Sequence, residues 1–166
     1  MGILTTTLRS LNYFAQNWNG MDHYIKSIEV RWADLDPNFH LRHSVYYDFG
    51  AYSRLNFFND NGLTSEVLSE YKIGPIIFRE EAVFRREIKL GDPVTIDLQL
   101  TRCRPDYSRW SIRHHIFKKR NELSAIITLD GAWINTVERK LSPAPPLGIE
   151  VFQAMPLGAD FEWVNI

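Results

Sequence analysis

Apolar and polar residues alternate over residues 94–101, a period of two that is typical of a β-strand with one buried face. The apolar positions are Val94, Ile96, Leu98 and Leu100. A less regular form of the pattern marks four further segments: 24–32, 76–88, 110–116 and 125–137. Turn-forming residues separate the later segments: Gly91-Asp92-Pro93, Pro105-Asp106 and residues 118–122. The sequence therefore predicts one early strand and four later antiparallel strands.

One segment of different character lies between the first two strands. Residues 45–61 carry aromatic and aliphatic side chains at helical spacing, with Ser44 as the expected N-cap and Gly62 just past the end. No wide polar face remains, which predicts a helix buried nearly all round. A short amphipathic helix is expected over residues 65–71. Because such a central helix needs a sheet around it, we predict an α+β domain whose curved antiparallel sheet wraps one long helix.

The two ends of the chain differ from this middle part. Residues 1–21 have no continuous apolar region and are interpreted as an N-terminal extension rather than a signal peptide. The domain is expected to span residues 22–142. Three prolines then end the regular structure: Pro143, Pro145 and Pro146. Residues 143–166 are therefore interpreted as a tail and not as a second domain.

Composition narrows the possible partners and the cellular compartment. The chain has 166 residues, 45% of them hydrophobic, and a formal charge of −1. This balance argues against a nucleic-acid partner or an electrostatic membrane anchor, and no segment approaches the ~20 apolar residues that cross a bilayer. The single cysteine, Cys103, excludes an internal disulfide and fits a reducing compartment. We therefore expect a cytoplasmic protein.

The predicted sheet also has consequences for assembly. A short curved sheet leaves an edge strand whose backbone groups are unpaired, and proteins protect such edges from uncontrolled pairing. Edge-to-edge pairing of the sheets of two copies gives this protection through a symmetric interface. The sequence therefore predicts a homodimer, with a dimer of dimers (a homotetramer) as the other expected assembly.

The candidate chemistry is concentrated between the first strand and the long helix. Carboxylate, amide, imidazole and guanidinium groups occur there in a short loop: Asp34, Asp36, Asn38, His40, Arg42 and His43. Acyl transfer needs a nucleophile or base together with backbone N–H groups aimed at a developing oxyanion. A polar loop at the start of a helix can supply both. Without further information, Asp36 is better explained as a cap of the turn before Pro37.

Metal binding is the other chemistry that this cluster suggests. The pattern Asp-x-Asp-x-Asn is found in calcium-binding loops, but the required Gly at the sixth place is Phe39 and the bidentate Glu at the twelfth is Val45. Zinc needs three or four ligands of fixed geometry, and no cysteine lies nearby. We therefore predict no metal site and no cofactor.

In this loop the chain resembles hotdog-fold thioesterases, namely the 4-hydroxybenzoyl-CoA thioesterase-like branch and the fatty acyl-ACP thioesterases. Their signature is approximately Asp-x-Asp-x-x-x-His-(Val/Leu)-Asn-Asn-x-x-Tyr. The matching positions here are Asp34, Asp36, His40, Leu41 and Tyr46, together with an Asn at position 38 as in the acyl-ACP enzymes. Further matches are Arg54 on the helix and the turn Gly91-Asp92. The sequence departs from the family pattern at Phe39, where the family often has Gly, and at Arg42 and His43, where it has the paired Asn. The resemblance covers about residues 22–142.

This resemblance implies an acyl-CoA or acyl-ACP thioesterase. Its catalytic carboxylate falls on Asp36, which either attacks the thioester carbonyl or activates a water molecule. Asn38 and His40 are implied as further catalytic residues, although His40 can equally stabilise the loop. The residues expected to form the oxyanion hole or to contact the substrate come shortly after His40 in the sequence: Arg42, His43, Ser44, Val45 and Tyr46. Two other carboxylates, Glu80 and Glu81, are expected to face solvent or form salt bridges.

Two other functions remain open at this stage. The substitutions at Arg42 and His43 leave room for a hotdog module that binds acyl thioesters without turnover. A hotdog-fold enoyl-thioester hydratase is disfavoured, because its His follows the Asp by five residues in an Asp-x-Asn-Pro-x-His pattern. Here His40 follows Asp36 by four.

Overall fold

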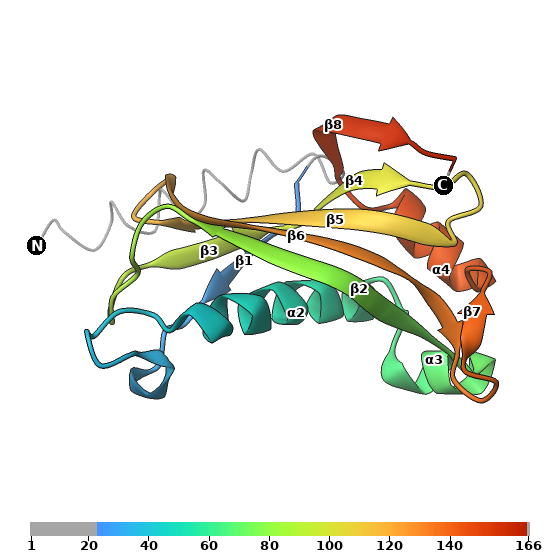
Figure 1. Cartoon of the computed structure of the whole chain (residues 1–166), viewed down its shortest axis with the longest axis horizontal. Helices are drawn as coiled ribbons and strands as arrows, with labels where there is room; N and C mark the ends of the chain where they lie inside the picture. Colours follow the sequence, from blue (N-terminus) through green and yellow to red (C-terminus); the bar gives the residue numbers. More distant parts are fainter. Residues whose placement is uncertain (1–22, 166) are drawn as a thin grey trace, which may run out of the picture.

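The computed structural model describes residues 23–165, so the expected N-terminal extension (residues 1–21) lies outside the described part. In this part an eight-stranded sheet curves around helix α2 (His43–Asp60), as Figure 1 shows. The strands are β1 (Ile25–Ile28), β2 (Ile73–Phe84), β3 (Val94–Asp97), β4 (Gln99–Cys103), β5 (Arg109–Lys118), β6 (Glu122–Asn135), β7 (Lys140–Ser142) and β8 (Leu157–Trp163). The predicted α+β architecture with one long helix is confirmed.

The pairing of the strands determines which strands lie at the edges of the sheet. β6 pairs with β2 on one side and with β5 on the other, and β3 and β1 continue the sheet beyond β5. β4 pairs with a further part of β5, and β8 adds to β4 in parallel. β7 pairs with the end of β6. Within residues 23–165 the long strand β2 therefore has one paired side and one open side.

Helix α2 buries one face rather than its whole circumference. The buried positions repeat at helical spacing: Val45, Tyr46, Phe49, Gly50, Ser53, Arg54, Phe57 and Phe58. On the opposite face Tyr52 is 48% exposed and Leu55 is 51% exposed, so the prediction of burial nearly all round is wrong for the single chain. The helix also begins two residues earlier than expected, with Arg42 and not Ser44 as its N-cap. No helix among residues 23–165 is long and apolar enough to cross a membrane.

Several predicted strand boundaries are wrong; the last strand, for instance, was expected at 125–137 and runs from Glu122 to Asn135. The first strand ends at Ile28, and the chain turns into a short 3₁₀ helix, η1 (Trp32–Asp34), which leaves Trp32 75% exposed instead of buried. The strand expected at 76–88 runs from Ile73 to Phe84. The alternating segment 94–101 is divided at Leu98, because its N–H donates to the Tyr24 carbonyl (3.1 Å) while its side chain stays buried.

The C-terminal residues pack into the domain, and the sequence analysis missed their structure. Pro146 begins helix α4 (Pro146–Gln153), where its missing N–H is tolerated in the first turn. Phe152 and Met155 are buried in the same apolar cluster as Trp133 of β6. The remaining helix, α3 (Ser65–Tyr71), matches its expected position, with the Thr64 hydroxyl accepting from the Val67 N–H (3.4 Å) at its N-terminus. The boundary expected at residue 142 thus cuts through the packed core.

A buried polar network fixes α2 against the sheet. Arg54 of α2 donates to Glu80 of β2 (3.1 Å) and contacts the Nε2 atom of His114 on β5 (3.2 Å). The Nδ1 atom of His114 lies 2.7 Å from the Asp97 carbonyl oxygen. Because Arg54 can only donate and a carbonyl can only accept, His114 is neutral with its proton on Nδ1. Complete burial, followed by the nearby charge of Arg54, lowers the pKa of His114 to about 3.

This neutral histidine predicts acid sensitivity of the fold. Between pH 6.5 and about 3 the unfolded chain binds a proton at His114 that the folded chain does not, so stability falls as the pH falls. The expected loss is about 1.4 kcal/mol per pH unit, or about 2 kcal/mol between pH 6.5 and 5. This loss is measured as the difference in the free energy of unfolding by urea between pH 6.5 and 5, for the wild type and for His114→Gln. The proposal of a neutral His114 is wrong if both proteins lose the same stability.

Candidate active site

The polar loop before α2 is a narrow hairpin closed by backbone hydrogen bonds. Leu35 and Leu41 form an antiparallel bridge, and the Asp36 N–H donates to the His40 carbonyl (2.7 Å). One step further from the tip, the Arg42 N–H donates to the Asp34 carbonyl (2.9 Å). The structure therefore places Asp36 and His40 opposite each other near the tip of the hairpin that leads into α2.

The Asp36 carboxylate is held by backbone donors of its own loop. Its Oδ1 atom accepts from the N–H groups of Asn38 (2.8 Å) and His40 (3.1 Å). The His40 N–H, followed by that of Asn38, holds the pKa of Asp36 below its usual range, so the half-buried carboxyl is anionic near neutral pH. The same bonds cap the turn, as expected for an Asp before Pro37. Asp36 can therefore combine a loop-stabilising and a chemical role.

The departure from the family signature at Phe39 has a clear geometric meaning. Phe39 has φ = 61°, in the left-handed region that glycine adopts without steric penalty. This explains why the resembling proteins often carry Gly before the His. In this chain the turn keeps its shape with a non-glycine residue, and the Phe39 ring is 71% exposed beside the loop.

A second segment supports the loop from the side. The Leu41 N–H donates to the carbonyl of the fully buried Ile88 (2.8 Å), and His40 forms an isolated bridge with Lys89. This segment, residues 87–89, follows β2 and brings Glu87 near His40. Hydrogen bonding to its own backbone N–H, then the charge of Lys118 and more weakly that of His40, lowers the pKa of Glu87. Sequence reasoning missed Glu87, because this proximity arises only in three dimensions.

The start of α2 provides the backbone donors expected of an oxyanion site. The first N–H groups of a helix have no intrahelical partner, and the helix dipole favours negative charge there. In α2 these include His43 and Ser44. The Val45 N–H instead donates to the Arg42 carbonyl (3.0 Å), which removes it from the expected set of free amides. The Arg42 guanidinium donates to the Ser44 hydroxyl (3.0 Å) at the exposed surface.

The loop, α2 and the sheet together match the model of a known protein family. A model of the thioesterase-like superfamily matches residues 30–154, which include the loop, α2 and the sheet. The chain belongs to this superfamily. It is therefore a thioester hydrolase by family, as its sequence predicted. No curated protein matches the chain.

Solved structures share the fold of this chain. A Staphylococcus aureus protein described as hypothetical and solved in complex with CoA matches with a TM-score of 0.75 and 16% identity, over 88% of this chain and 90% of that one. A DHNA-CoA thioesterase from Staphylococcus aureus matches with a TM-score of 0.70 and 19% identity, over 80% and 90%. A 1,4-dihydroxy-2-naphthoyl-CoA thioesterase from Synechocystis matches with a TM-score of 0.71 and 15% identity, over 79% and 96%. The shared fold confirms the predicted hotdog architecture.

Within this superfamily fold, the other signature residues are structural in the single chain. Asp34 is 2% exposed, and both of its oxygens are bound by the Arg31 side chain (2.7 and 3.1 Å). Tyr46 is buried, with its ring edge-on to Phe84 at 5.0 Å. Neither side chain lies open at the loop surface, although Tyr46 was expected among the substrate contacts. Across residues 23–165, no three His, Cys, Asp or Glu side chains are close enough to hold a metal ion.

The alternative carboxylates on β2 are engaged elsewhere in this thioesterase fold. Glu80 pairs with Arg54 (3.1 Å), and Glu81 lies 3.5 Å from Arg79. Both therefore form the salt bridges that the sequence analysis expected.

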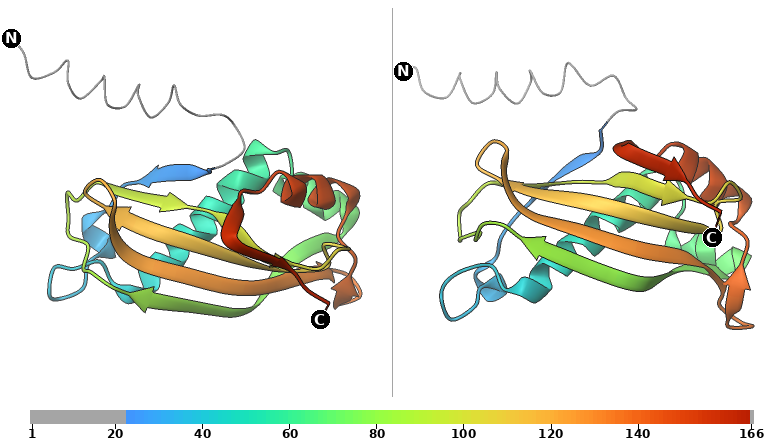
Figure 2. Two further views of the ribbon diagram at one scale, coloured as in Figure 1. Left: turned by 90° about the horizontal axis from the view of Figure 1, so that it is seen from above. Right: turned by 45° about the horizontal axis from the view of Figure 1, so that its top comes forward.

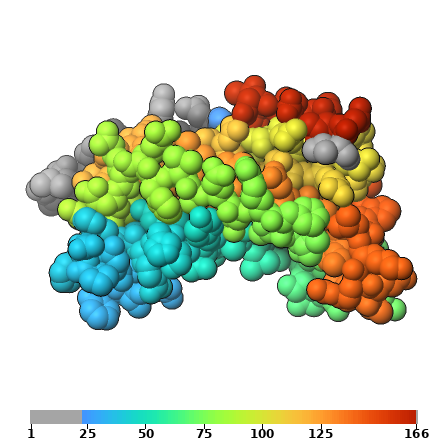
Figure 3. Space-filling view, viewed as in Figure 1, coloured from blue at the N-terminus to red at the C-terminus, as the bar shows by residue number. Residues whose placement is uncertain are grey.

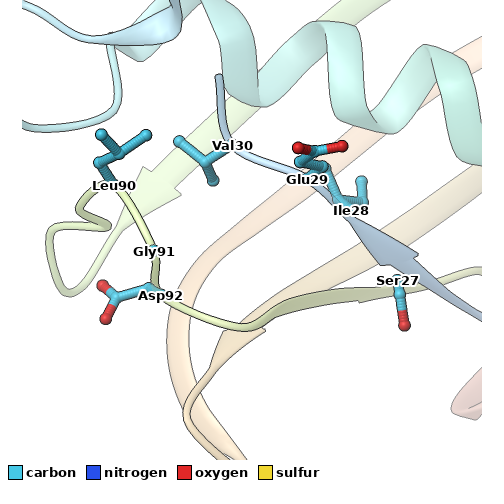
Figure 4. Close-up of a pocket in the computed structure, with 7 residues that line it drawn as sticks. All are labelled: Ser27, Ile28, Glu29, Val30, Leu90, Gly91 and Asp92. Atoms are coloured by element: carbon cyan, nitrogen blue, oxygen red, sulfur yellow. The ribbon is translucent and has the colours of Figure 1, made fainter. Parts of the chain in front are cut away.

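A surface pocket of about 610 Å³ lies beside the loop but does not include it. Ser27, Ile28, Glu29, Val30, Leu90, Gly91 and Asp92 line this pocket, which Figure 4 shows between the end of β1 and the turn before β3. Asp36, Asn38 and His40 are outside its lining. The hairpin tip with Asp36 therefore stands apart from this pocket.

Proposed function

We propose that this protein hydrolyses acyl thioesters of CoA, or of an acyl carrier protein, to a free acid and a thiol, with Asp36 as the catalytic carboxylate. One observation carries the proposal. Asp36 occupies the carboxylate position of the thioesterase signature, is anionic because two backbone N–H groups bind it, and lies in the hairpin that leads into an 18-residue helix.

The proposed chemistry uses the carboxylate and the helix terminus together. Asp36 either attacks the thioester carbonyl carbon, forming an anhydride that water then hydrolyses, or removes a proton from a water molecule that attacks it. The carbonyl oxygen becomes an oxyanion, which the His43 and Ser44 amides stabilise. The carbon–sulfur bond then breaks, and the thiolate leaves and takes up a proton. We assign His40 and Asn38 to orienting Asp36 and the substrate.

Two observations support CoA as the carrier. One similar structure was solved with CoA bound, and two others are named as thioesterases of aromatic acyl-CoA compounds. In this chain the exposed Arg42 guanidinium stands beside the proposed oxyanion amides, where it can pair with a carrier phosphate. An acyl carrier protein remains the second candidate, because Asn38 matches the acyl-ACP enzymes.

We also propose that two copies pair through β2 to form a homodimer. Within the described residues β2 pairs only with β6, and its surface carries apolar side chains beside α2: Ile77, Phe78, Val83 and Phe84. Figure 3 shows β2 (green) at the surface above the helix (cyan). Phe84 contacts Tyr46 one turn from the proposed site, so the partner's β2 would border both active sites.

The dimer proposal predicts that a charge on this strand separates the copies. Val83 is 40% exposed, so Val83→Lys is tolerated in one chain but buries an unpaired charge in the dimer. Light scattering is expected to show a halved mass and the assay a large loss of activity. Leu157→Lys, on an exposed apolar residue of β8, which pairs with β4 and not with β2, is the matched control. A wild type that is already monomeric contradicts the proposal.

A thiol-release assay tests the proposed function. The purified protein is offered a panel of aliphatic and aromatic acyl-CoA and acyl-ACP thioesters, and free thiol is followed with a chromogenic disulfide. Hydrolysis of acyl-CoA substrates is the expected result. Binding of acyl-CoA without thiol release would instead identify a binding module, and loss of enoyl absorbance with enoyl-CoA would identify a hydratase.

A further inference from the structure

A buried lysine lies behind the proposed active-site loop and has no place in the chemistry described above. Lys118 ends β5 on the inward face of the sheet, in line with Ile112, His114 and Ile116, which are all fully buried. Lys118 itself is only 7% exposed. Lysine is almost never buried to this extent without a specific partner, because removing an ammonium from water is strongly unfavourable.

The ammonium of Lys118 is directed at the segment that supports the loop. Its Nζ donates to the Glu87 carbonyl oxygen. The next residue, Ile88, accepts the Leu41 N–H through its own carbonyl, and Lys89 bridges His40. A continuous chain of contacts therefore leads from the buried ammonium through residues 87–89 to the base of the hairpin.

The contacts beyond residues 87–89 reach the proposed catalytic carboxylate. The His40 N–H, which belongs to the bridged residue, is one of the two donors to Asp36 Oδ1. The charge of Lys118 also helps keep Glu87 ionised beside His40. In Figures 1 and 2 the connection from β2 to β3, the β5–β6 turn and the loop before α2 lie at the same end of the molecule. Lys118 thus joins the end of β5 to residues 87–89, which in turn contact the loop before α2.

We infer that Lys118 is a positioning residue for the thioesterase site. Its ammonium fixes residues 87–89, and these fix His40 and through it the Asp36 carboxylate. Lys118 does not touch the substrate in this arrangement. The catalytic part of the inference rests on the proposed function, whereas the mechanical part concerns the loop alone and is measured without substrate.

Lys118→Met tests the mechanical part, because methionine keeps an unbranched apolar stem but lacks the ammonium. Hydrogen–deuterium exchange of the Leu41 amide, which donates to Ile88, is expected to become at least tenfold faster. Exchange at the far end of β6, at Ile134, is expected to stay unchanged, which separates local loosening from global destabilisation. Lys119→Met is the matched control, since Lys119 is the exposed neighbour on the same turn. Unchanged exchange at Leu41 overturns the inference.

The catalytic part is tested with the hydrolysed thioester. A misplaced Asp36 stabilises the transition state less well but hardly affects the affinity for substrate. Lys118→Met is therefore expected to lower kcat about tenfold and to change KM by less than about twofold. The comparison is made at a temperature at which near-UV circular dichroism shows both proteins fully folded. A wild type that releases no thiol refutes the proposed function, while the exchange experiment still decides the role of Lys118. An unchanged kcat with faster Leu41 exchange overturns the catalytic part.

Discussion

Replacing Asp36 by Asn is expected to abolish most thioester hydrolysis while leaving the fold intact. The Asn side-chain oxygen still accepts the N–H groups of Asn38 and His40, so the hairpin keeps its two bonds. The variant lacks the negatively charged carboxylate oxygen that attacks the carbonyl carbon or accepts a proton from water. We expect kcat to fall by about 10²–10⁴-fold, the usual contribution of a positioned general base, and by more if the carboxylate is the nucleophile.

A control variant and a measurement of thermal stability show whether the loss of activity is due to the missing charge of Asp36. Asp48→Asn removes an exposed carboxylate from α2 by the same chemical change and is expected to retain full activity. A melting temperature of Asp36→Asn within a few degrees of that of the wild type excludes a folding defect. Full activity of Asp36→Asn in the thiol-release assay would refute the proposed mechanism.

The second large effect is expected from the buried arginine of α2. Arg54→Met leaves Glu80 without its cation and His114 without its donor. Removing one partner of a buried ion pair destabilises a protein by about 3–5 kcal/mol, because the remaining charge stays poorly solvated. Urea unfolding at pH 7 is expected to show a decrease of this size.

A double mutant and a surface control test the origin of this effect. Arg54→Met combined with Glu80→Gln is expected to be less destabilised than the sum of the two single variants, because no unpaired charge remains. Arg79→Met breaks exposed ion pairs with Glu81 on the same strand and with Asp130 on β6, and is expected to change stability by less than about 1 kcal/mol. Equal losses for Arg54→Met and Arg79→Met would show that burial of the network is unimportant.

The parts of the structure that could be predicted from the sequence are those with a local cause. Strict alternation placed the strand residues 94–101 correctly on one buried face, although the division at Leu98 depends on a hydrogen bond to distant Tyr24. The spacing from Asp36 to His40 identified the loop before α2, but its hairpin form, with the Asp36 N–H donating to the His40 carbonyl, appeared only in the structure. Composition misled at α2, because the aromatic ring of Tyr52 counts as apolar but is half exposed.

The parts that could not be predicted depend on contacts between distant segments. Glu87 follows β2 and Lys118 ends β5, and the two residues meet only because both strands, which flank β6, end on the same side of the sheet. The C-terminal helix was missed because Pro146 was interpreted as the end of regular structure, whereas it begins α4. Phe152 then contacts Trp133 on β6, with 5.6 Å between the ring centroids. The local sequence pattern does not predict this contact.

The position of this C-terminal helix matters for any shortened or fused version of the protein. α4 closes the core at the end of the sheet away from the loop that carries Asp36, as Figure 1 shows. A version that stops at residue 142 would lack Phe152 and Met155 and would leave Trp133 uncovered. A carrier or label attached after residue 165, in contrast, is held at a distance from the loop. The two ends of one sheet thus offer separate places for altering stability and for altering catalysis.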